Sequence, residues 1–325
     1  VLIDPTEKPI NRPDIVLFTH AHLDHVSGAP HMPSTALMFS SKPTKTIIEF
    51  KYPKLKGYML NTLPIGLRIE LDNLAIEAYD AGHVVGSRQY VIDHRGIRVG
   101  VTGDINTVKS LTEQPAERLR DIDILVIEAT YGSDFYIFPD RSDLYAGINH
   151  WVKETLRRRT IPIMAGYALG KAQELTALAS RIIGINVYVT REVARYNKVF
   201  EEHRGRKLGW GILEPSRTPE LASEDAVIIT SNSNALKLAS KLSIYGIKCE
   251  TAYFSGWALS RRYPGRGFPL SSHADHKMLV DYVDDVKPKI VYTVYGFKRS
   301  LAKSLRRKLG IEANPIRVIS PLRPS

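Results

Sequence analysis

Three histidines and an aspartate, His20, His22, Asp24 and His25, lie within six residues near the start of this 325-residue chain. The apolar run Ile-Val-Leu-Phe at residues 15–18 leads directly into them, and its short, branched character predicts a buried strand. The four side chains would then lie on the loop at the strand's end, where alternating histidines can converge on one ion. Imidazole nitrogens and carboxylate oxygens are ligands for zinc or manganese. The alternative is a surface histidine tract that binds metal adventitiously, but such a tract rarely follows a buried strand.

The order His-x-His-x-Asp-His after a strand resembles the metallo-β-lactamase superfamily, and further motifs follow in that family's order. Asp4, after a short apolar start, resembles the strand-end aspartate that orients the histidine loop. Ala-Gly-His-Val-Val-Gly-Ser around His83 resembles the third motif, and Val-Thr-Gly-Asp ending at Asp104 resembles the fourth. The resemblance implies an α/β fold, a four-layer αββα sandwich.

The middle of the chain follows a different pattern. Helices and strands are predicted to alternate there, at residues 142–159, 161–165, 170–181 and 185–190, which is typical of a parallel α/β unit. We therefore expect a metallo-β-lactamase domain in two parts, residues 1–135 and 256–325, interrupted by a domain at 136–255. Such an insertion resembles the β-CASP branch of the superfamily, which consists of nucleases.

Further motifs of that branch are present. Glu128 in Glu-Ala-Thr-Tyr-Gly resembles its first extra motif, and His273 in Ser-Ser-His-Ala-Asp resembles its second. Residues 167–173, 254–257 and 266–273 are similar to the exonucleases associated with DNA ligase and to the Artemis-like DNA cross-link repair nucleases. Asp275 and His276 could support His273, or they could simply begin the next helix.

The resemblance implies which side chains bind metal and which move protons. The implied ligands are His20, His22 and His83 for a first ion, Asp24 and His25 for a second, and Asp104 as the bridge. The expected cofactor is zinc, as one or two ions, because two metals about 4 Å apart position and activate water at a phosphodiester. The catalytic residues would be Asp24, Glu128 and His273, with His273 held by Glu128 and protonating the leaving 3′ oxygen.

One position departs from the branch. Many members end a late strand in Val-His-Gly, whose histidine completes the second metal position, whereas this chain has Val-Tyr-Gly around Tyr295. A neutral tyrosine is a poor ligand because its pKa lies near 10. The second ion is therefore expected to bind weakly or to exchange with manganese or magnesium. The departure also favours DNA over RNA, although Tyr295 could instead contact substrate.

Candidate substrate contacts lie at the mouth of the inserted domain. Tyr167, Lys171, Ser271 and Ser272 could hold a terminal phosphate, which would make the enzyme an exonuclease. Lys171 could equally be a solvated lysine at a helix start. Basic clusters at residues 157–159, 204–207 and 261–266 could bind phosphates or form solvated faces. The aromatic side chains that could stack on bases or pack in the core are Tyr131, Tyr136 and Trp257.

Composition limits the remaining possibilities. The net charge of +11 and a pI near 9.5 favour a polyanionic partner, nucleic acid above all, although a generally basic surface would give the same value. The single cysteine excludes an internal disulfide and suits a cytoplasmic location. No apolar run approaches the roughly 20 residues of a membrane span, so no membrane partner is expected. Protein partners are left open.

Three hypotheses follow from the sequence. The first is a metal-dependent DNA nuclease, acting as a 5′ exonuclease. The second is an RNA-processing endonuclease or exonuclease of the same branch. The third is a member of the fold that binds nucleic acid without cleaving it, which the presence of every ligand of the first ion and of the Glu128–His273 pair disfavours.

Overall fold

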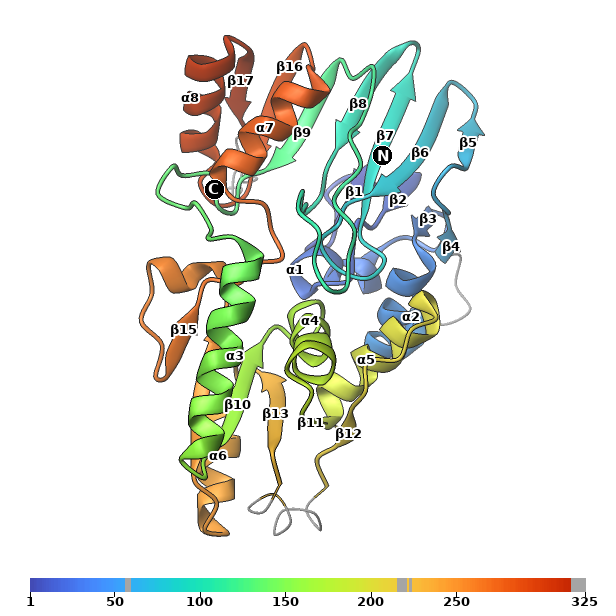
Figure 1. Cartoon of the computed structure of the whole chain (residues 1–325). Coiled ribbons are helices and arrows are strands. Elements are labelled where there is room, and N and C mark those ends of the chain that lie inside the picture. Colours follow the sequence, from blue (N-terminus) through green and yellow to red (C-terminus); the bar gives the residue numbers. More distant parts are fainter. Residues whose placement is uncertain (56–59, 215–220, 222–223, 317–325) are drawn as a thin grey trace, which may run out of the picture.

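The computed structural model describes residues 1–55, 60–214, 221 and 224–316, and these residues form three β-sheets (Figure 1). A parallel four-stranded sheet contains β1 (Leu2–Ile3), β2 (Ile15–Leu17), β3 (Leu37–Ser40) and β4 (Leu60–Thr62) in that order. A seven-stranded sheet has the order β17-β16-β9-β8-β7-β6-β5. Its strands are β5 (Arg68–Leu71), β6 (Leu74–Asp80), β7 (Arg88–His94), β8 (Ile97–Val101), β9 (Ile124–Glu128), β16 (Ile290–Val294) and β17 (Glu312–Pro315).

These two sheets pack face to face, and β2 shows why. Ile15 and Leu17 lie in one apolar cluster with Tyr90 of the seven-stranded sheet, whereas Val16 lies in another with Ile48 of α2 (Lys42–Lys51). Alternate side chains of a strand point to opposite faces, so β2 is buried on both. The predicted four-layer αββα sandwich is confirmed.

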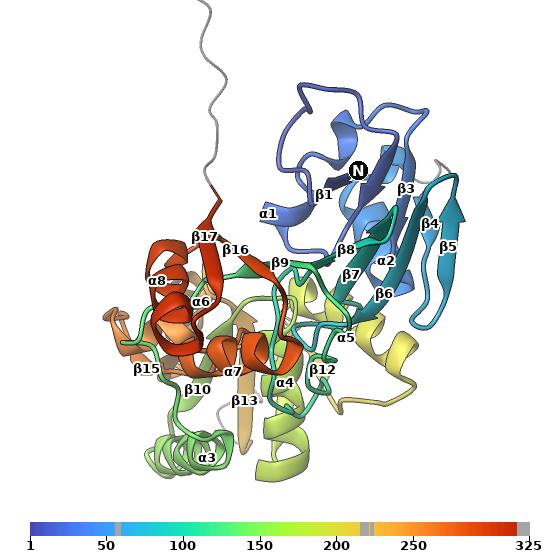
Figure 2. The same cartoon turned by 90° about the horizontal axis from the view of Figure 1, so that it is seen from above.

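The outer face of the seven-stranded sheet is covered by α7 (His276–Val286) and α8 (Lys298–Leu309). The apolar stripes of both helices are buried on β9 and β16, through Leu279, Val283, Leu301 and Leu305. Figure 2 shows β1–β3 on one side of this sheet and α7 on the other.

Turn geometry decides two local features of the first part of the chain. Residues 94–96 form the β7–β8 turn, with φ of +53° at Arg95 and +81° at Gly96, as a tight hairpin requires. Residues 69–78, which alternate like a single strand, instead form β5 and β6. Asp72 turns the chain between them with φ of +53°, a conformation that aspartate tolerates well.

Residues 115–120, whose composition suggests a helix, form none. The backbone N–H of Ala116 donates to the Asn106 carbonyl, and that of Glu117 donates to the Asp80 carbonyl. The Glu117 side chain accepts from the N–H of Asp80 in return. Hydrogen bonds to distant segments therefore replace the local ones that a helix would make.

Residues 141–268 build a second lobe around a parallel six-stranded sheet. The sheet has the order β12-β11-β13-β10-β14-β15. Its strands are β10 (Ile161–Gly166), β11 (Asn186–Val189), β12 (Gly211–Ile212), β13 (Ala226–Ser231), β14 (Cys249–Phe254) and β15 (Arg266–Phe268). Its helices are α3 (Arg141–Arg157), α4 (Lys171–Ala177), α5 (Arg191–Arg204) and α6 (Ala235–Ile244), with α3 and α4 packed on one face and α6 on the other.

Strand β15 belongs to this sheet although it lies beyond the expected domain boundary at residue 255. The sheet therefore continues into the segment that leads back to the sandwich. The division of the chain into 1–135, 136–255 and 256–325 stays a prediction.

The two lobes meet at an apolar contact beside the histidine loop. Val84 and Val85 of the sandwich lie in one cluster with Leu169 and with Phe200 of α5. Gly170, with φ of +90°, sits where a β-carbon would lie 2.3 Å from Val84 Cγ1. Only glycine fits this approach, which places the start of α4 over the loops of the sandwich.

Within the described residues, no helix is long and apolar enough to span a membrane.

Candidate metal centre

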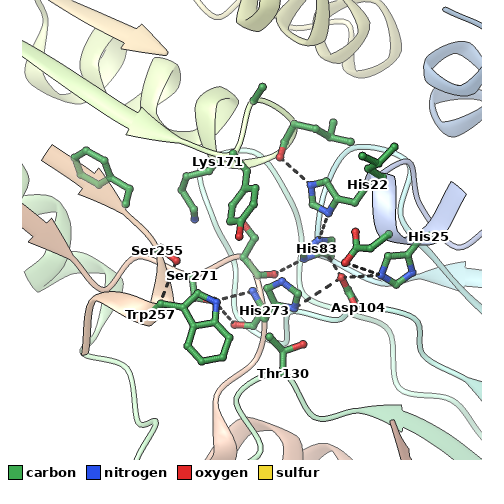
Figure 3. A pocket seen from close by; sticks show the side chains of 18 of the residues that line it. His22, His25, His83, Asp104, Thr130, Lys171, Ser255, Trp257, Ser271 and His273 are labelled. Carbon is green, nitrogen blue, oxygen red and sulfur yellow. Dashed lines mark hydrogen bonds and ion pairs between the residues drawn. The ribbon is translucent and has the colours of Figure 1, made fainter. Parts of the chain in front are cut away.

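The motif residues gather where loops of the sandwich meet the second lobe. The contributing positions are His20, His22, Asp24 and His25 after β2, His83 after β6, Asp104 after β8, Glu128 at the end of β9 and His273 before α7. Most of them line a cavity of about 740 Å³, whereas His20 and Glu128 are fully buried behind its wall. Figure 3 shows the imidazoles of His22, His25, His83 and His273 around the Asp104 carboxylate.

Hydrogen bonds decide which ring nitrogen of His22 and His83 faces this cavity. His22 Nε2 lies 3.1 Å from the carbonyl oxygen of Leu169, and His83 Nδ1 lies 2.8 Å from that of Ser272. Because a carbonyl oxygen only accepts, each of these nitrogens carries its ring's proton. In the neutral rings, His22 Nδ1 and His83 Nε2 are therefore bare, and they lie 3.2 Å apart.

A chain of hydrogen bonds from Asp4 through Thr19 fixes the tautomer of His20 in the same way. The Thr19 hydroxyl donates to Asp4 Oδ2 at 2.6 Å, and the Thr19 N–H donates to Asp4 Oδ1 at 2.7 Å. Since the hydroxyl proton is used, Thr19 Oγ1 accepts from His20 Nδ1 at 3.1 Å. His20 Nε2 is then bare as well, and Asp4 orients the loop through its contacts instead of facing the cavity.

The three bare nitrogens converge on one point. His20 Nε2 lies 3.0 Å from His22 Nδ1, which in turn lies 3.2 Å from His83 Nε2. Lone pairs at this separation repel each other, whereas a cation between them would attract all three. A tetrahedral ion with metal–nitrogen bonds of about 2.0–2.1 Å separates its ligand atoms by about 3.3 Å. The donor spacing fits such an ion.

Burial keeps these imidazoles in the neutral form that binds metal. It holds the pKa values of His20 and His83 well below the usual range. It also lowers the pKa of His22 to about 4. A cation would therefore not have to compete with protons at these three rings near neutral pH.

Asp104 stands at the centre of the histidines. Its Oδ2 lies 3.4 Å from His20 Nε2, 3.4 Å from His25 Nε2 and 3.7 Å from His83 Nε2. Burial opposes ionisation, but the histidines, His25 first, outweigh it and hold the pKa of Asp104 well below its usual range. One carboxylate oxygen thus faces the histidines of both predicted metal positions.

The second position is built on His25. Its Nδ1 lies 2.8 Å from Asp4 Oδ2, so Nε2 points towards Asp104. Burial alone would lower the pKa of His25, but the carboxylates of Asp104 and Asp4 raise it to about 11. An ion bound here would displace a proton from Nε2.

The other expected neighbours of that position are more open. The Asp24 carboxylate is 82% exposed and lies 4.0 Å from His25 Nε2. The Tyr295 ring lies 5.5 Å from the His25 ring, and burial, aided by nearby carboxylates, raises the pKa of its phenol. A protonated phenol is a weak ligand, so fewer donors enclose the second position than the first among the described residues.

Glu128 and His273 form a pair beside the same cavity. His273 Nδ1 lies 3.0 and 3.1 Å from the two carboxylate oxygens of the fully buried Glu128, and Oε1 also accepts from the Ile105 N–H. Burial opposes charging of His273, but Glu128, followed by Asp104, outweighs it and raises the pKa to about 9. With Nδ1 held by Glu128, Nε2 is the nitrogen that can give a proton to a bound molecule.

Lys171 lines the cavity but does not stand free in it. Its ammonium is 3% exposed and donates to Glu174 Oε2 at 2.8 Å, and Arg141 binds the other oxygen of the same carboxylate. Burial lowers the pKa of Lys171 to about 8. This cluster places two cations against one carboxylate at the wall of the cavity.

Replacing Glu174 with glutamine is expected to destabilise the fold by about 3–5 kcal/mol, because two buried cations lose their shared counter-charge. Urea unfolding would measure the change. The matched control is Glu154→Gln, which removes an exposed carboxylate paired with Arg157 and should change stability by less than about 0.5 kcal/mol. Equal effects of the two substitutions would contradict the buried network.

The other predicted substrate contacts differ in exposure. Tyr167 is 55% exposed and lines the cavity, with its ring 6.0 Å from that of His22. Ser271 is buried, and its hydroxyl bonds to the backbone of His273. Ser272 lines the cavity, and its carbonyl oxygen accepts a hydrogen bond from His83 Nδ1. Both serines therefore shape the histidine positions, whatever else they bind.

Several alternatives left open by the sequence are resolved by burial. Tyr131 and Tyr136 are 2% and 4% exposed and pack against Trp257, and Tyr131 and Trp257 also line the cavity. Stacking of these two rings on a base stays a prediction. Asp275 caps α7 by accepting from the Met278 N–H. His276 is buried between the Gly132 carbonyl and Ser304. The pair Asp275 and His276 therefore serves the helix start.

The roles of Thr19 and of the Leu169 carbonyl were not predicted. The only sequence signal for the role of Thr19 was its position between the strand and His20.

Replacing Thr19 with valine is expected to weaken zinc affinity about 10–100-fold, because His20 loses its fixed tautomer. Competition with a chromophoric chelator would measure this, with Thr62→Val at an exposed position of β4 as the control. Unchanged affinity would show that another group orients His20.

Comparison with known proteins agrees with the sequence motifs and with the geometry of the site. Residues 2–167, more than half of the 325-residue chain, match the family model described as "Beta-lactamase superfamily domain". The chain belongs to the metallo-β-lactamase superfamily. The model covers the histidine loop, His83, Asp104 and Glu128, so these motif residues lie within its match.

Three relatives extend the likeness of this metallo-β-lactamase chain. A "Probable DNA ligase" of Opitutus terrae is 27% identical over 91% of this chain and 28% of its own length. An "RNase J-like protein" of Methanocaldococcus jannaschii is 31% identical over 52% of this chain and 44% of its own length. An "RNase aCSPSF2" of Saccharolobus solfataricus is 24% identical over 90% of this chain and 72% of its own length. These are relatives of β-CASP type, and the predicted recognition is confirmed.

The chain spans less than half the length of the first two of these relatives. Similarity to a part of a longer protein does not transfer that protein's whole activity.

Proposed function

We propose that this protein is a metal-dependent nuclease that hydrolyses phosphodiester bonds in nucleic acid. The observation that carries the proposal is the orientation of the imidazoles. His20, His22 and His83 each give their N–H to an oxygen and direct a bare nitrogen at one point beside Asp104. A purely structural histidine cluster would use these lone pairs in hydrogen bonds.

The proposed ligands are those of the sequence prediction. His20, His22, His83 and Asp104 would hold the first ion, and Asp104, His25 and Asp24 would hold the second. Zinc is the proposed metal, because imidazoles and a carboxylate suit it. The second position, with Tyr295 in place of a histidine, is proposed to accept manganese or magnesium. Bound there, such ions supply Lewis acidity and lower the pKa of water.

The chain's own residues complete the reaction. His273, whose pKa is raised to about 9 above the usual value, is proposed to hold a proton at Nε2 near neutral pH and to pass it to the departing 3′ oxygen. Glu128 keeps the ring in position by accepting from Nδ1. Because both nitrogens of His273 are assigned, the same ring cannot also bind an ion at Nε2 during this step.

RNA is the first candidate substrate. The relatives from Methanocaldococcus and Saccharolobus carry ribonuclease names, and the second of them matches 90% of this chain. We therefore propose RNA processing as the first activity to test, ahead of the DNA cleavage that the sequence motifs favour.

DNA is the second candidate, and a specific observation supports it. The match to a probable DNA ligase covers 91% of this chain, and Tyr295 departs from the histidine that RNA-processing members usually keep. Action from a strand end is proposed from the Lys171 cluster, whose two cations exceed its one carboxylate. A terminal phosphate could bind at that wall of the cavity.

One experiment separates these candidates. Matched single strands of RNA and DNA, each with a 5′ phosphate or a 5′ hydroxyl and labelled at the 3′ end, are incubated with zinc, manganese or magnesium. Internal cuts confined to RNA would support the first candidate. A phosphate-dependent ladder from the 5′ end of DNA would support the second. Failure to cleave any strand with any metal would refute the nuclease proposal.

A further inference from the structure

Helix α8 carries an unusual concentration of positive charge. Six of its twelve residues are lysine or arginine, and none is acidic. Arg299, Lys303, Arg306, Arg307 and Lys308 are exposed. The apolar residues Leu301 and Leu305 are buried in the sandwich core, so the charged face alone is open to a partner. This arrangement excludes insertion of α8 into a lipid surface, which needs a free apolar face.

The charges of α8 are not neutralised by its neighbours. Helix α7 packs beside it and carries three carboxylates. Asp281 pairs with Lys277, Asp285 pairs with Arg118, and among the described residues exposed Asp284 makes no ion pair with α8. Arg306 donates to the Ala313 carbonyl. Within the part of the chain that the structure describes, Arg299, Lys303 and Arg307 contact no carboxylate.

Two of the three basic clusters noted in the sequence, residues 157–159 and 204–207, differ in this respect, whereas Arg261, Arg262 and Arg266 make no ion pair within the described residues. Arg157 pairs with Glu154, and Arg158 pairs with Glu250. Arg204 pairs with the buried Glu113, and Lys207 pairs with Glu201. Most cations of these two clusters are therefore paired with carboxylates, whereas Arg299, Lys303 and Arg307 of α8 are not.

Helix α8 also begins at the cavity. Tyr295 and Gly296 line the cavity, and Phe297, the next residue, caps the helix. The Phe297 ring lies 6.2 Å from that of Trp257, another lining residue, over which the Arg261 guanidinium lies at 4.5 Å. Figures 1 and 2 show α8 and the segment around β15 on the same side of the molecule. Aromatic rings and cations therefore connect the cavity with the helix.

We propose that the exposed face of α8 binds the phosphate backbone of the nucleic-acid strand whose reacting phosphate lies in the cavity. The proposal rests on the nuclease function and adds the path of the strand outside the site. Arg299, Lys303 and Arg307 follow each other at intervals of four residues and form one stripe about 12 Å long. Phosphates of one strand rise by about 3.4 Å each along the axis of a duplex, so a stripe of this length can contact more than one of them.

The test is the triple variant Arg299→Gln, Lys303→Gln and Arg307→Gln. Binding of labelled single strands of about 20 nucleotides is measured by fluorescence anisotropy in a chelator, between about 50 and 200 mM salt. The dissociation constant is expected to rise about tenfold or more, and the log–log salt slope is expected to become shallower by about 2. Hydrolysis of a small phosphodiester, bis(p-nitrophenyl) phosphate, is expected to be unchanged, because it does not reach α8.

The matched control removes three exposed lysines at the far end of the second lobe, Lys237→Gln, Lys241→Gln and Lys248→Gln. This variant has the same charge loss and should bind the strands as tightly as the wild type does. Equal weakening in both variants, or none in the α8 variant, would overturn the proposal. If the wild type cleaves no strand but binding still falls only in the α8 variant, the nuclease function fails and the α8 surface stands.

Discussion

Replacing Asp104 with asparagine is expected to lower kcat/KM for phosphodiester cleavage by more than about 1,000-fold and to reduce the zinc content of the protein. Asp104 Oδ2 lies within 3.4–3.7 Å of three imidazole nitrogens that belong to both proposed metal positions. An amide keeps the shape but removes the negative charge that holds two cations close together. The loss should therefore be larger than that caused by any change to a residue that only orients a ligand.

Two measurements together check this prediction. Elemental analysis of the purified variant gives the metal content, and steady-state cleavage of the preferred strand gives kcat/KM. The control is Asp284→Asn on the exposed face of α7, which makes the same chemical change away from the cavity. An Asp104 variant with full activity and full zinc content would remove the proposed metal assignment.

The convergence of the proposed ligands was predictable in part because several of their motifs follow strands: His20 follows β2, His83 follows β6 and Asp104 follows β8. Buried strands end at fixed places in the sandwich, so His20 after β2 and Asp104 after β8 had to lie at one edge. The apolar pattern of residues 15–18 was sufficient to place the first of these strands. These motifs thus share a position next to a strand end, and the fold brings those strand ends close together.

The tautomers of these histidines were not predictable from the sequence. His22 takes its orientation from the Leu169 carbonyl, 147 residues away, and His83 takes its orientation from the Ser272 carbonyl, 189 residues away. Backbone carbonyls have no residue type, so no motif marks them. They come into place only when the two lobes pack around Gly170.

The same limit explains the incorrect prediction of a helix at residues 115–120. The local composition suits a helix, but tertiary hydrogen bonds from Ala116 and Glu117 decide the backbone. Likewise, the sequence left open whether Lys171 binds a phosphate or is a solvated lysine at a helix start, and the structure buries it against Glu174. Helix propensity is a property of a segment by itself, whereas the conformation of both segments here depends on contacts with residues elsewhere in the chain.

Replacing His273 with alanine is expected to lower kcat for a natural phosphodiester about 100- to 10,000-fold while leaving the zinc content unchanged. His273 is assigned to proton donation because Glu128 occupies its Nδ1, and a poor leaving group such as a 3′ alkoxide needs that proton. A p-nitrophenyl ester of a nucleotide has a leaving group that departs without one. The variant should therefore retain nearly full activity on the nitrophenyl substrate. Equal losses on both substrates would assign His273 to metal binding or to structure.

The pH dependence gives an independent check of the same role. Burial opposes charging of His273, but Glu128 and Asp104 raise its pKa to about 9, so the acid form predominates below that value. For a natural substrate, kcat should fall as the pH rises through about 9, because the ring then loses the proton that it must donate. In Glu128→Gln the carboxylate that stabilises the charged ring is gone, and this alkaline limb should move to lower pH. A limb that stays in place in that variant would mean that a group other than His273 titrates there.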